Sequence, residues 1–488
     1  MINKILIANR GEIAVRVIRT CKEMGIKTIA VYSDADRSSL HVILADEAYH
    51  IGKSPANESY LNIRRILSII KQSKPDAVHP GYGFLSENYE FAKSITDMGL
   101  KWIGAPSDAI RLMGDKIKAR EFAKKNFIPL IPGIEDKFEN LKNITNSVNK
   151  IGYPILIKAA SGGGGIGMRI VNKEADLQNS FNLAKSEAKR SFLDSRVYIE
   201  KYLEEPHHIE IQIASDFHGN HLSLGERECS IQRRYQKLIE ECPSPFIDNE
   251  LREKLKNEAI KLIKACNYVG VGTVEFLVDK HKNWYFLEMN TRLQVEHPIT
   301  ELVYRVDLVK TQIQIASGTN IRKILKNKTQ IGHSIECRIY AENGYKNFQP
   351  STGTIIDYFP PSGPGIRFDE GFIRGQEISP FYDPMLGKLI VYAENRDEAI
   401  AKLIRALGEL KIVGLITSAK FCIEILSHDK FKSGNYCTDT LEQILPEIIK
   451  SKSKKIKLSN VILAHDRYKA KTGKLKTDKS DSNWIISS

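Results

Sequence analysis

The sequence predicts an α/β protein of several domains, and three observations lead to this expectation. The chain opens with an apolar strand at residues 4–8, a turn at residues 9–12, a helix at residues 13–24 and a second strand at residues 26–32. From about residue 126 the pattern changes to short strands around a glycine-rich loop. The length of 488 residues exceeds what one core ordinarily holds and suggests about three domains.

The first domain is expected to be an open, doubly wound α/β domain. In its first helix, Ile13, Val17, Cys21 and Met24 recur at helical spacing, and Gly25 is the expected C-terminal cap. The strand that follows at once predicts a parallel sheet, whose ligands should lie beyond the carboxyl ends of the strands. The same alternation then predicts a helix at 61–70, a strand at 77–79, a turn at 80–83, a helix near 91 and a strand at 102–104.

The middle of the chain predicts a hairpin lid followed by a mixed sheet. Strands at residues 153–160 and 168–171 flank the glycine loop at residues 161–167. Strand-like runs that predict the mixed sheet lie at 197–199, 209–213, 272–278 and 284–289. Short extended runs rich in Pro and Gly then occupy residues 334–392, before a helix at 396–410.

The positive charge is concentrated at the end of the chain. Of the net charge of +13, residues 450–479 carry +9, from eleven basic and two acidic side chains. This excess predicts a solvated tail, and binding of an anion or a partner through it is the less favoured alternative. The seven cysteines form no C-x-x-C pair, and the apolar run near Met1 is too short for a signal peptide or a membrane span. We therefore expect a cytoplasmic protein that binds neither a membrane nor nucleic acid.

Polar residues recur at every second position of residues 284–297. In an extended chain the residues on this face are Glu288, Asn290, Arg292, Gln294 and Glu296. A solvated strand face is the alternative interpretation. Glu275 favours a ligand site, because an acid flanked by apolar residues in a nearby strand is unlikely without a partner. Carboxylates with an amide oxygen suit Mg²⁺ or Mn²⁺ better than zinc.

The glycine loop is the candidate phosphate-binding segment. Its backbone amides, including those of Gly163, Gly164 and Gly165, can close over phosphates beside the charge of Lys158. A plain linker is the alternative. Lys116 and Lys237 are not specific on their own, and in the His207-His208 pair a hydrogen bond to a nucleotide or carboxylate is favoured over a metal site.

Long stretches of the sequence together resemble biotin carboxylase, a family of the ATP-grasp superfamily. The resemblance extends from residue 1 to about residue 444, and the segments that carry it are ILIANRGEIAVRVIRTCKEMGI, HPGYGFLSEN, IRLMGDK, KAASGGGGIGM, EKYLEEPHHIEIQ, RRYQK, EMNTRLQVEHP, ECRIYAEN and YDPMLGKL. It implies an ATP-grasp fold with an N-terminal Rossmann-like domain at residues 1–115. An ATP-grasp domain at 116–330 would contain a mobile lid at about 130–204, and a C-terminal biotin carboxylase domain at 331–445 would precede the basic tail at 446–488.

The resemblance also implies a role for each candidate residue. ATP and two Mg²⁺ or Mn²⁺ ions are the implied cofactors. The implied ATP-binding residues are Lys116, Lys158, Gly163, Gly164, Gly165, Glu200, Lys201, Leu203, His208, Gln232, Tyr235, Glu275 and Glu288, and the implied metal ligands are Glu275, Glu288 and Asn290. Bicarbonate would be held by Lys237, Arg292, Gln294 and the backbone of Val295, with Glu296 as the base, Arg338 stabilising the biotin enolate and Tyr82 seating biotin.

Three residues depart from the family pattern. Ser161 stands where the family usually has glycine or alanine, Ile166 where it has a basic residue, and Tyr235 where it has histidine. We expect altered ATP affinity and retained chemistry, because none of the three is an implied metal, bicarbonate or base residue.

The implied partners follow from the missing biotin attachment site. No Met-Lys-Met motif occurs, so biotin is expected on a separate biotin carboxyl carrier protein. Carboxyltransferase subunits would complete the enzyme, the chain itself would form a homodimer, and an acyl-CoA such as acetyl-CoA or propionyl-CoA is the favoured final acceptor. The alternatives are the ATP-binding subunit of a pyruvate carboxylase, another ATP-grasp carboxylate ligase, and an interaction protein that uses the basic tail.

Overall fold

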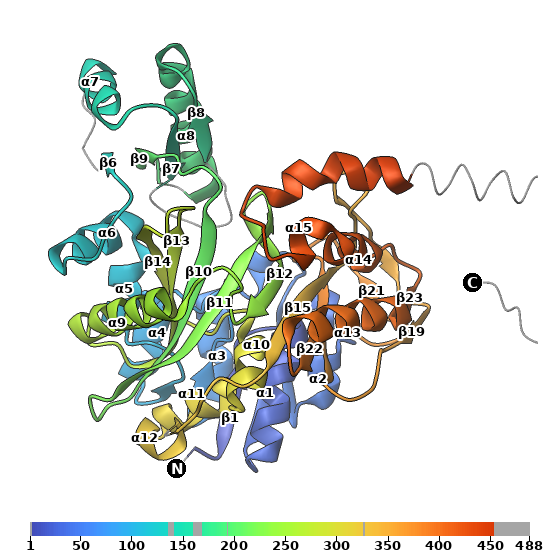
Figure 1. Ribbon diagram of the computed structural model, residues 1–488. Helices are drawn as coiled ribbons and strands as arrows, with labels where there is room; N and C mark the ends of the chain where they lie inside the picture. The colour runs from blue at the N-terminus through green and yellow to red at the C-terminus, as the bar shows by residue number, and fades with distance from the viewer. Residues whose placement is uncertain (1, 135–140, 160–167, 193, 326, 453–488) are drawn as a thin grey trace, which may run out of the picture. The chain divides into compact units, whose positions relative to one another are not determined.

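A computed structural model describes residues 2–134, 141–159, 168–192, 194–325 and 327–452. The chain divides into two compact units, residues 1–441 and 442–488. In the second unit residues 442–452 are described, and they are helical. The sheets and the cavity presented below belong to the first unit (Figure 1).

The N-terminal part of the first unit is built on a parallel sheet in the order β3-β2-β1-β4-β5. Its strands are β1 (Lys4–Ile7), β2 (Lys27–Ser33), β3 (Glu47–Gly52), β4 (Ala77–His79) and β5 (Lys101–Trp102). The helices of this part are α1 (Gly11–Glu23), α2 (Leu40–Leu44), α3 (Ile63–Ser73), α4 (Tyr89–Asp97), α5 (Ser107–Gly114) and α6 (Lys116–Lys125). The doubly wound order confirms the predicted fold class, and β3 is a strand that the sequence pattern did not indicate.

The strand order reverses between β1 and β4, so the turns after these two strands meet. Asn9 follows β1, and its side-chain amide donates to the carbonyls of Pro80 and Tyr82 at 2.6 and 2.7 Å. Gly81 has a φ of +63°, and a Cβ there would lie 2.9 Å from the Asn9 amide nitrogen. A glycine is therefore required where the two turns approach each other. This is the edge at which the sequence predicted ligands.

A second sheet, in the order β6-β9-β7-β8, forms the region expected to contain the lid. Its strands are β6 (Gly133–Ile134), β7 (Ile155–Ala159), β8 (Arg169–Val171) and β9 (Val197–Lys201), with helices α7 (Leu141–Ile151) and α8 (Leu177–Phe192). Antiparallel pairing of β7 with β8 confirms the predicted hairpin. The glycine loop at residues 161–167 lies outside the described residues, as does most of the basic tail.

The largest sheet among the described residues is antiparallel, in the order β14-β13-β10-β11-β12-β15-β22-β20. Its strands are β10 (His207–Ser215), β11 (His221–Arg233), β12 (Gln236–Cys242), β13 (Gly270–Val278), β14 (Trp284–Asn290), β15 (His333–Tyr340), β20 (Ile366–Glu370) and β22 (Met385–Ala393). Because β12 pairs with β15, this sheet crosses the boundary expected near residue 330. Residues on either side of that boundary are therefore held in one continuous hydrogen-bonded surface.

Helices and short strand pairs complete the first unit. The helices are α9 (Asn249–Ala265), α10 (His297–Tyr304), α11 (Leu308–Ala316), α12 (Ile321–Leu325), α13 (Arg396–Glu409), α14 (Ala419–Ser427) and α15 (Asp429–Lys432). The paired short strands are β16 (Glu342–Asn343) with β17 (Gln349–Pro350), β18 (Gly353–Thr354) with β21 (Glu377–Ile378), and β19 (Asp357–Phe359) with β23 (Lys411–Val413). The sequence predicted short extended runs for residues 334–392, where most of these short strands lie.

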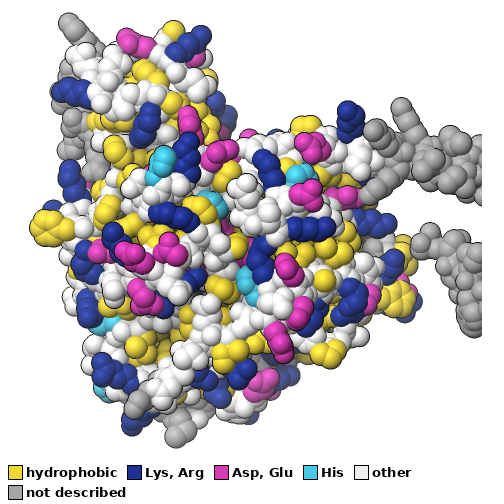
Figure 2. All heavy atoms as spheres, in the orientation of Figure 1, with side chains coloured by type: hydrophobic (Ala, Val, Ile, Leu, Met, Phe, Trp, Pro, Cys, Tyr) yellow, Lys and Arg dark blue, Asp and Glu magenta, His cyan; other side chains and the backbone are white. Residues whose placement is uncertain are grey.

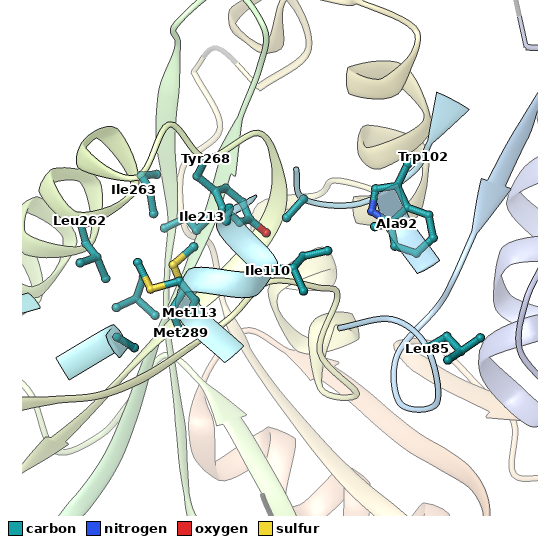
Figure 3. Close-up of a cluster of buried hydrophobic side chains, with 14 of the residues drawn as sticks. Leu85, Ala92, Trp102, Ile110, Met113, Ile213, Leu262, Ile263, Tyr268 and Met289 are labelled. Atoms are coloured by element: carbon teal, nitrogen blue, oxygen red, sulfur yellow. The ribbon is translucent and has the colours of Figure 1, made fainter. Parts of the chain in front are cut away.

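One apolar core joins the N-terminal helices to the large sheet. Met113 of α5 and Met289 of β14 lie together in it, with Ile213 of β10 and Leu262 of α9 nearby (Figure 3). Burial of these side chains fixes β14, which carries two of the candidate metal ligands.

On the face drawn in Figure 2, acidic and basic side chains are interspersed. Within the described part of the chain, no helix combines the length and the apolar character needed to cross a membrane.

Glu241 on β12 links the large sheet to the C-terminal helices. Its carboxylate accepts hydrogen bonds from His333 at 2.6 Å, from Arg396 at 2.8 and 2.9 Å, and from Tyr436 at 2.5 Å. Burial alone would raise the pKa of Glu241, but these hydrogen bonds and the adjacent charges lower it from 4.5 to about 2. The folded state therefore favours the ionised carboxylate.

We expect Glu241→Gln to lower the free energy of unfolding by about 3 kcal/mol at neutral pH, because the depressed pKa reports stabilisation of the charged form. Since that pKa is lower in the folded than in the unfolded state, the contribution is full above pH 4.5 and is lost as the pH falls towards 2. Urea unfolding of both proteins across this range measures it. Equal free energies of unfolding at neutral pH would contradict the prediction.

Candidate active site

A cavity of about 730 Å³ lies between the N-terminal turns, the lid sheet and the large sheet. Its lining contains almost every described residue that the sequence indicated: Tyr82, Lys116, Lys158, Glu200, Lys201, Leu203, His208, Gln232, Tyr235, Lys237, Glu275, Glu288, Asn290, Arg292, Gln294, Val295 and Arg338. Glu296 does not line the cavity, because its side chain is fully buried behind Lys237 and Arg338. Gly163, Gly164, Gly165, Ser161 and Ile166 lie outside the described residues.

The expectation of one extended polar face over residues 284–297 is only partly correct. Strand β14 ends at Asn290, so Glu288 and Asn290 lie on it, whereas Arg292, Gln294 and Glu296 belong to a turn. The chain turns because α10 begins at His297, with proline in its first turn. The turn nevertheless brings Arg292 and Gln294 to the same cavity.

Two facing carboxylates form one wall of the cavity. Glu275 on β13 is the register partner of Glu288 on β14. One oxygen of Glu275 accepts from the side-chain amides of Asn290 and Gln294, both at 2.7 Å. Lys116, the first residue of α6, lies 2.9 Å from the Glu288 carboxylate, and the Asp115 side chain caps that helix.

Both carboxylates are held in the ionised form. Burial alone would raise the pKa of Glu275, but Lys237 and His208 lower it below its ordinary value. In the same way Lys116 outweighs burial and lowers the pKa of Glu288. Two ionised carboxylates beside the amide of Asn290 are a donor set that suits a hard divalent cation.

His208 lies between the acid wall and Gln232. Its Nε2 is 2.7 Å from the Glu275 carboxylate, and its Nδ1 is 2.7 Å from the Gln232 amide nitrogen. The sequence interpretation of His208 as a partner of a carboxylate is therefore confirmed.

At the lid end of the cavity, two positive charges share one buried carboxylate. Lys158 on β7 forms an ion pair with Glu200 on β9, and Arg120 contacts the other oxygen of Glu200 at 3.2 Å. Burial lowers the pKa of Lys158, an effect that the charge of Glu200 opposes. The Lys201 ammonium donates instead to the carbonyls of Gly152 and Tyr153. Lys158 is thus the lid cation best placed to meet a phosphate.

Lys237 forms ion pairs with three carboxylates. Its ammonium lies 2.6 Å from Glu210, 3.1 Å from Glu275 and 2.7 Å from Glu296. Arg338 contacts Glu296 at 3.0 Å from the other side and contacts Glu240 at 2.6 Å. An anion entering this corner would meet both the ammonium and the guanidinium.

The ionised state of Glu296 depends on its two cationic neighbours. Burial alone would raise the pKa of Glu296, but Lys237 and Arg338 lower it well below its ordinary value. The Glu296 carboxylate is therefore ionised at neutral pH. Arg292 extends the cationic surface, and it is held by Glu87 at 2.8 Å and by the Gln294 oxygen at 2.9 Å.

The sequence interpretation missed several supporting residues, which are Glu87, Glu210, Arg227, Glu240 and Lys388. Glu210 carries the same signal as Glu275, an acid between two apolar neighbours, and the structure shows it fully buried between Arg227 and Lys237. The other contacts join residues distant in sequence, so no local pattern reveals them.

Family models cover nearly all of the first unit. Residues 1–110 match the N-terminal domain of biotin carboxylase, residues 115–324 match the ATP-binding domain of the carbamoyl-phosphate synthase L chain, and residues 336–443 match the C-terminal domain of biotin carboxylase.

Curated relatives agree with these models. The chain is 49% identical over 443 residues to "Biotin carboxylase 1" of Bacillus subtilis, covering 91% of this chain and 98% of the relative. It is 48% identical over 442 residues to "Biotin carboxylase" of Nostoc, covering 91% and 99%. Longer relatives also match: the chain spans 62% of the mitochondrial methylcrotonoyl-CoA carboxylase subunit alpha of Rattus norvegicus, at 47% identity over 91% of this chain.

Solved structures show the same fold. A biotin carboxylase complex with β,γ-ATP from Campylobacter jejuni aligns with a TM-score of 0.88 and 45% identity, over 91% of this chain and 99% of that chain. The biotin carboxylase domain of the Hydrogenobacter thermophilus 2-oxoglutarate carboxylase, in complex with MgADP and bicarbonate, gives a TM-score of 0.89 and 43% identity, over 92% and 99%. The chain therefore belongs to the biotin carboxylase family, whose members are ATP-dependent ligases.

Proposed function

We propose that this chain is the biotin carboxylase subunit of a multi-subunit carboxylase, which carboxylates biotin on a separate carrier protein with ATP and bicarbonate. The observation that carries this proposal is the enclosure of Glu296 by Lys237 and Arg338, next to the facing carboxylates Glu275 and Glu288. An anion-binding pair and a cation-binding wall thus share one cavity, and the proposed proton acceptor lies directly behind the anion-binding pair.

Bicarbonate would bind against Lys237, Arg292 and Gln294, with the Val295 amide as a further donor. Glu296 would take the bicarbonate proton, and the freed oxygen would attack the γ-phosphorus of ATP while ADP leaves. Carboxyphosphate would then break down to CO2 and phosphate, and the phosphate would remove the proton from the ureido nitrogen of biotin. Arg338 would stabilise the enolate that attacks CO2.

Glu275, Glu288 and Asn290 would hold two Mg²⁺ or Mn²⁺ ions, which neutralise phosphate charge when bound. Lys116 and Lys158 would approach the phosphates from α6 and from the lid. Glu200, Lys201, Leu203, Gln232 and Tyr235 line the part of the cavity proposed for the nucleotide, and Tyr82 lines the part proposed for biotin.

The wider assembly is also proposed. A homodimer is supported by the relative from Hydrogenobacter thermophilus, whose biotin carboxylase domain is described as a dimer. Carboxyltransferase subunits would use the carboxybiotin, with an acyl-CoA as the favoured acceptor, although similar chains are named for pyruvate and 2-oxoglutarate carboxylases. Division into domains at residues 1–115, 116–330 and 331–445, and a cytoplasmic location, remain predictions from the sequence.

Glu296→Gln is expected to lower the rate of ADP release with free biotin and bicarbonate by at least about 100-fold, because the amide cannot accept the proton. The KM for ATP should change little, since Glu296 does not line the cavity. Glu301→Gln is the matched control: this buried carboxylate on α10 pairs with Arg16 and Arg367 at 2.8 and 2.7 Å, away from the cavity. Activity of Glu296→Gln equal to that of the control would exclude Glu296 as the base.

Removal of divalent cations with a chelator should abolish ADP release, and added Mg²⁺ should restore it. In Glu288→Gln the Mg²⁺ concentration for half-maximal activity should rise at least about 10-fold, because one carboxylate ligand is lost. A titration of activity with Mg²⁺ measures this in the variant and in Glu301→Gln. An unchanged Mg²⁺ requirement in Glu288→Gln would remove this residue from the metal site.

Deletion of residues 453–488 tests whether the basic tail takes part in the proposed reaction. We expect the shortened chain to keep bicarbonate-dependent ADP release within about twofold of the full chain, because the cavity lies wholly in residues 9–439. Loss of that activity in a folded, shortened chain would contradict this expectation and would give the tail a part in catalysis.

A further inference from the structure

A fully buried lysine lies directly behind the proposed bicarbonate site. Lys388 on β22 has no exposed surface, and its ammonium donates to the carbonyl of Val295 at 2.7 Å. The same ammonium lies 3.5 Å from the carboxylate of Glu12 at the start of α1. The proposed reaction does not use this side chain. Burial of a cation destabilises the fold unless opposite charges and hydrogen bonds compensate it, so this position calls for an explanation.

Charged groups on β15, β20 and α1 lie around Lys388. Arg338 on β15 and Asp369 on β20 are its register partners on the two adjoining strands. Glu336 on β15 is fully buried, and α1 contributes Glu12. Neither Glu12 nor Glu336 has a hydrogen-bond partner for its carboxylate oxygens within the described part of the chain.

The two acids differ from ordinary surface carboxylates. Burial raises the pKa of Glu12 to about 7, although Lys388 opposes the shift. Burial also raises the pKa of Glu336 well above its ordinary value, again against the charge of Lys388. The Lys388 ammonium opposes the rise in the pKa of both acids, and its hydrogen bond is directed to the Val295 carbonyl.

That carbonyl belongs to the turn that carries the proposed anion site. Val295 stands between Gln294, which lines the cavity, and Glu296, the proposed base. The backbone carbonyl of Gln294 lies 2.8 Å from His297 Nδ1. The side-chain amide of Gln294 donates to Glu275 at 2.7 Å. The hydrogen bond from Lys388 fixes the peptide plane between Val295 and Glu296.

We propose that Lys388 is a positioning residue for bicarbonate use: its ammonium anchors the Val295 carbonyl, fixes the Val295–Glu296 peptide plane and thereby sets the direction of the Glu296 side chain. This inference rests on the proposed function, since it assigns the same turn to bicarbonate. Lys388 does not touch the substrate. Its loss should therefore impair bicarbonate use far more than ATP binding, which depends on Lys116, Lys158 and the acid wall.

Lys388→Met removes the charge and the donor while keeping a side chain of similar length. We expect the KM for bicarbonate to rise at least about 10-fold and the KM for ATP to stay within about threefold, because a small displacement of a substrate-holding turn is costly. Lys388→Arg keeps the charge and so protects the fold, but its longer side chain displaces the carbonyl. For this variant we expect a rise in the bicarbonate KM of at least about threefold. Both constants come from ADP release with free biotin.

Glu241→Gln is the matched control, because it also removes a buried charge from the large sheet but lies outside the cavity. It should lower the melting temperature while leaving both KM values within about twofold of wild type. A folded Lys388→Met or Lys388→Arg protein whose bicarbonate KM stays within about twofold of wild type would overturn the inference. If wild type itself shows no bicarbonate-dependent ADP release, the proposed function fails instead.

Discussion

The candidate site depends on the buried ion pairs of Glu296 with Lys237 and Arg338. Glu296 is fully buried, and the side chains of Lys237 and Arg338 are only 11% exposed. A buried charge without an opposite charge would destabilise the fold by several kcal/mol. Lys237 comes from β12, Arg338 from β15 and Glu296 from the turn before α10. The charges can compensate one another only when these elements are assembled, so folding of the large sheet and formation of the site are one event.

The apolar core also supports this arrangement. Met289 and Phe286 of β14 are buried in it, while Glu288 on the same strand faces the cavity. Phe286 and Glu288 are two residues apart yet lie on opposite sides, because the pairing of β13 with β14 is irregular between them, and the buried neighbours fix the direction of Glu288. Lys388 adds a polar contact to this support. Its ammonium holds the backbone carbonyl of Val295, which lies outside the strands and so has no strand partner.

Local patterns predicted a large part of both the fold and the candidate site. Period-two polarity identified Glu288 and Asn290, and an acid among apolar residues identified Glu275, because strand alternation and the cost of a buried charge are local signals. The extended face was wrong beyond Asn290, because β14 ends there and an irregular segment leads into α10. The pairing of Lys388 with Glu12 joins residues near opposite ends of the chain, and only the resemblance to a family, not a local pattern, brought Arg338 to attention.

The pairing of β12 with β15 has a practical consequence for anyone who dissects this protein. Family models treat residues 115–324 and 336–443 as separate modules, but a cut between them would leave β12 with a free edge of unpaired amides and carbonyls. Exposed edges of this kind recruit other strands and promote aggregation. The sequence modules are therefore poor units for expression, and fragments that keep β10 to β22 together are the smallest that preserve this sheet.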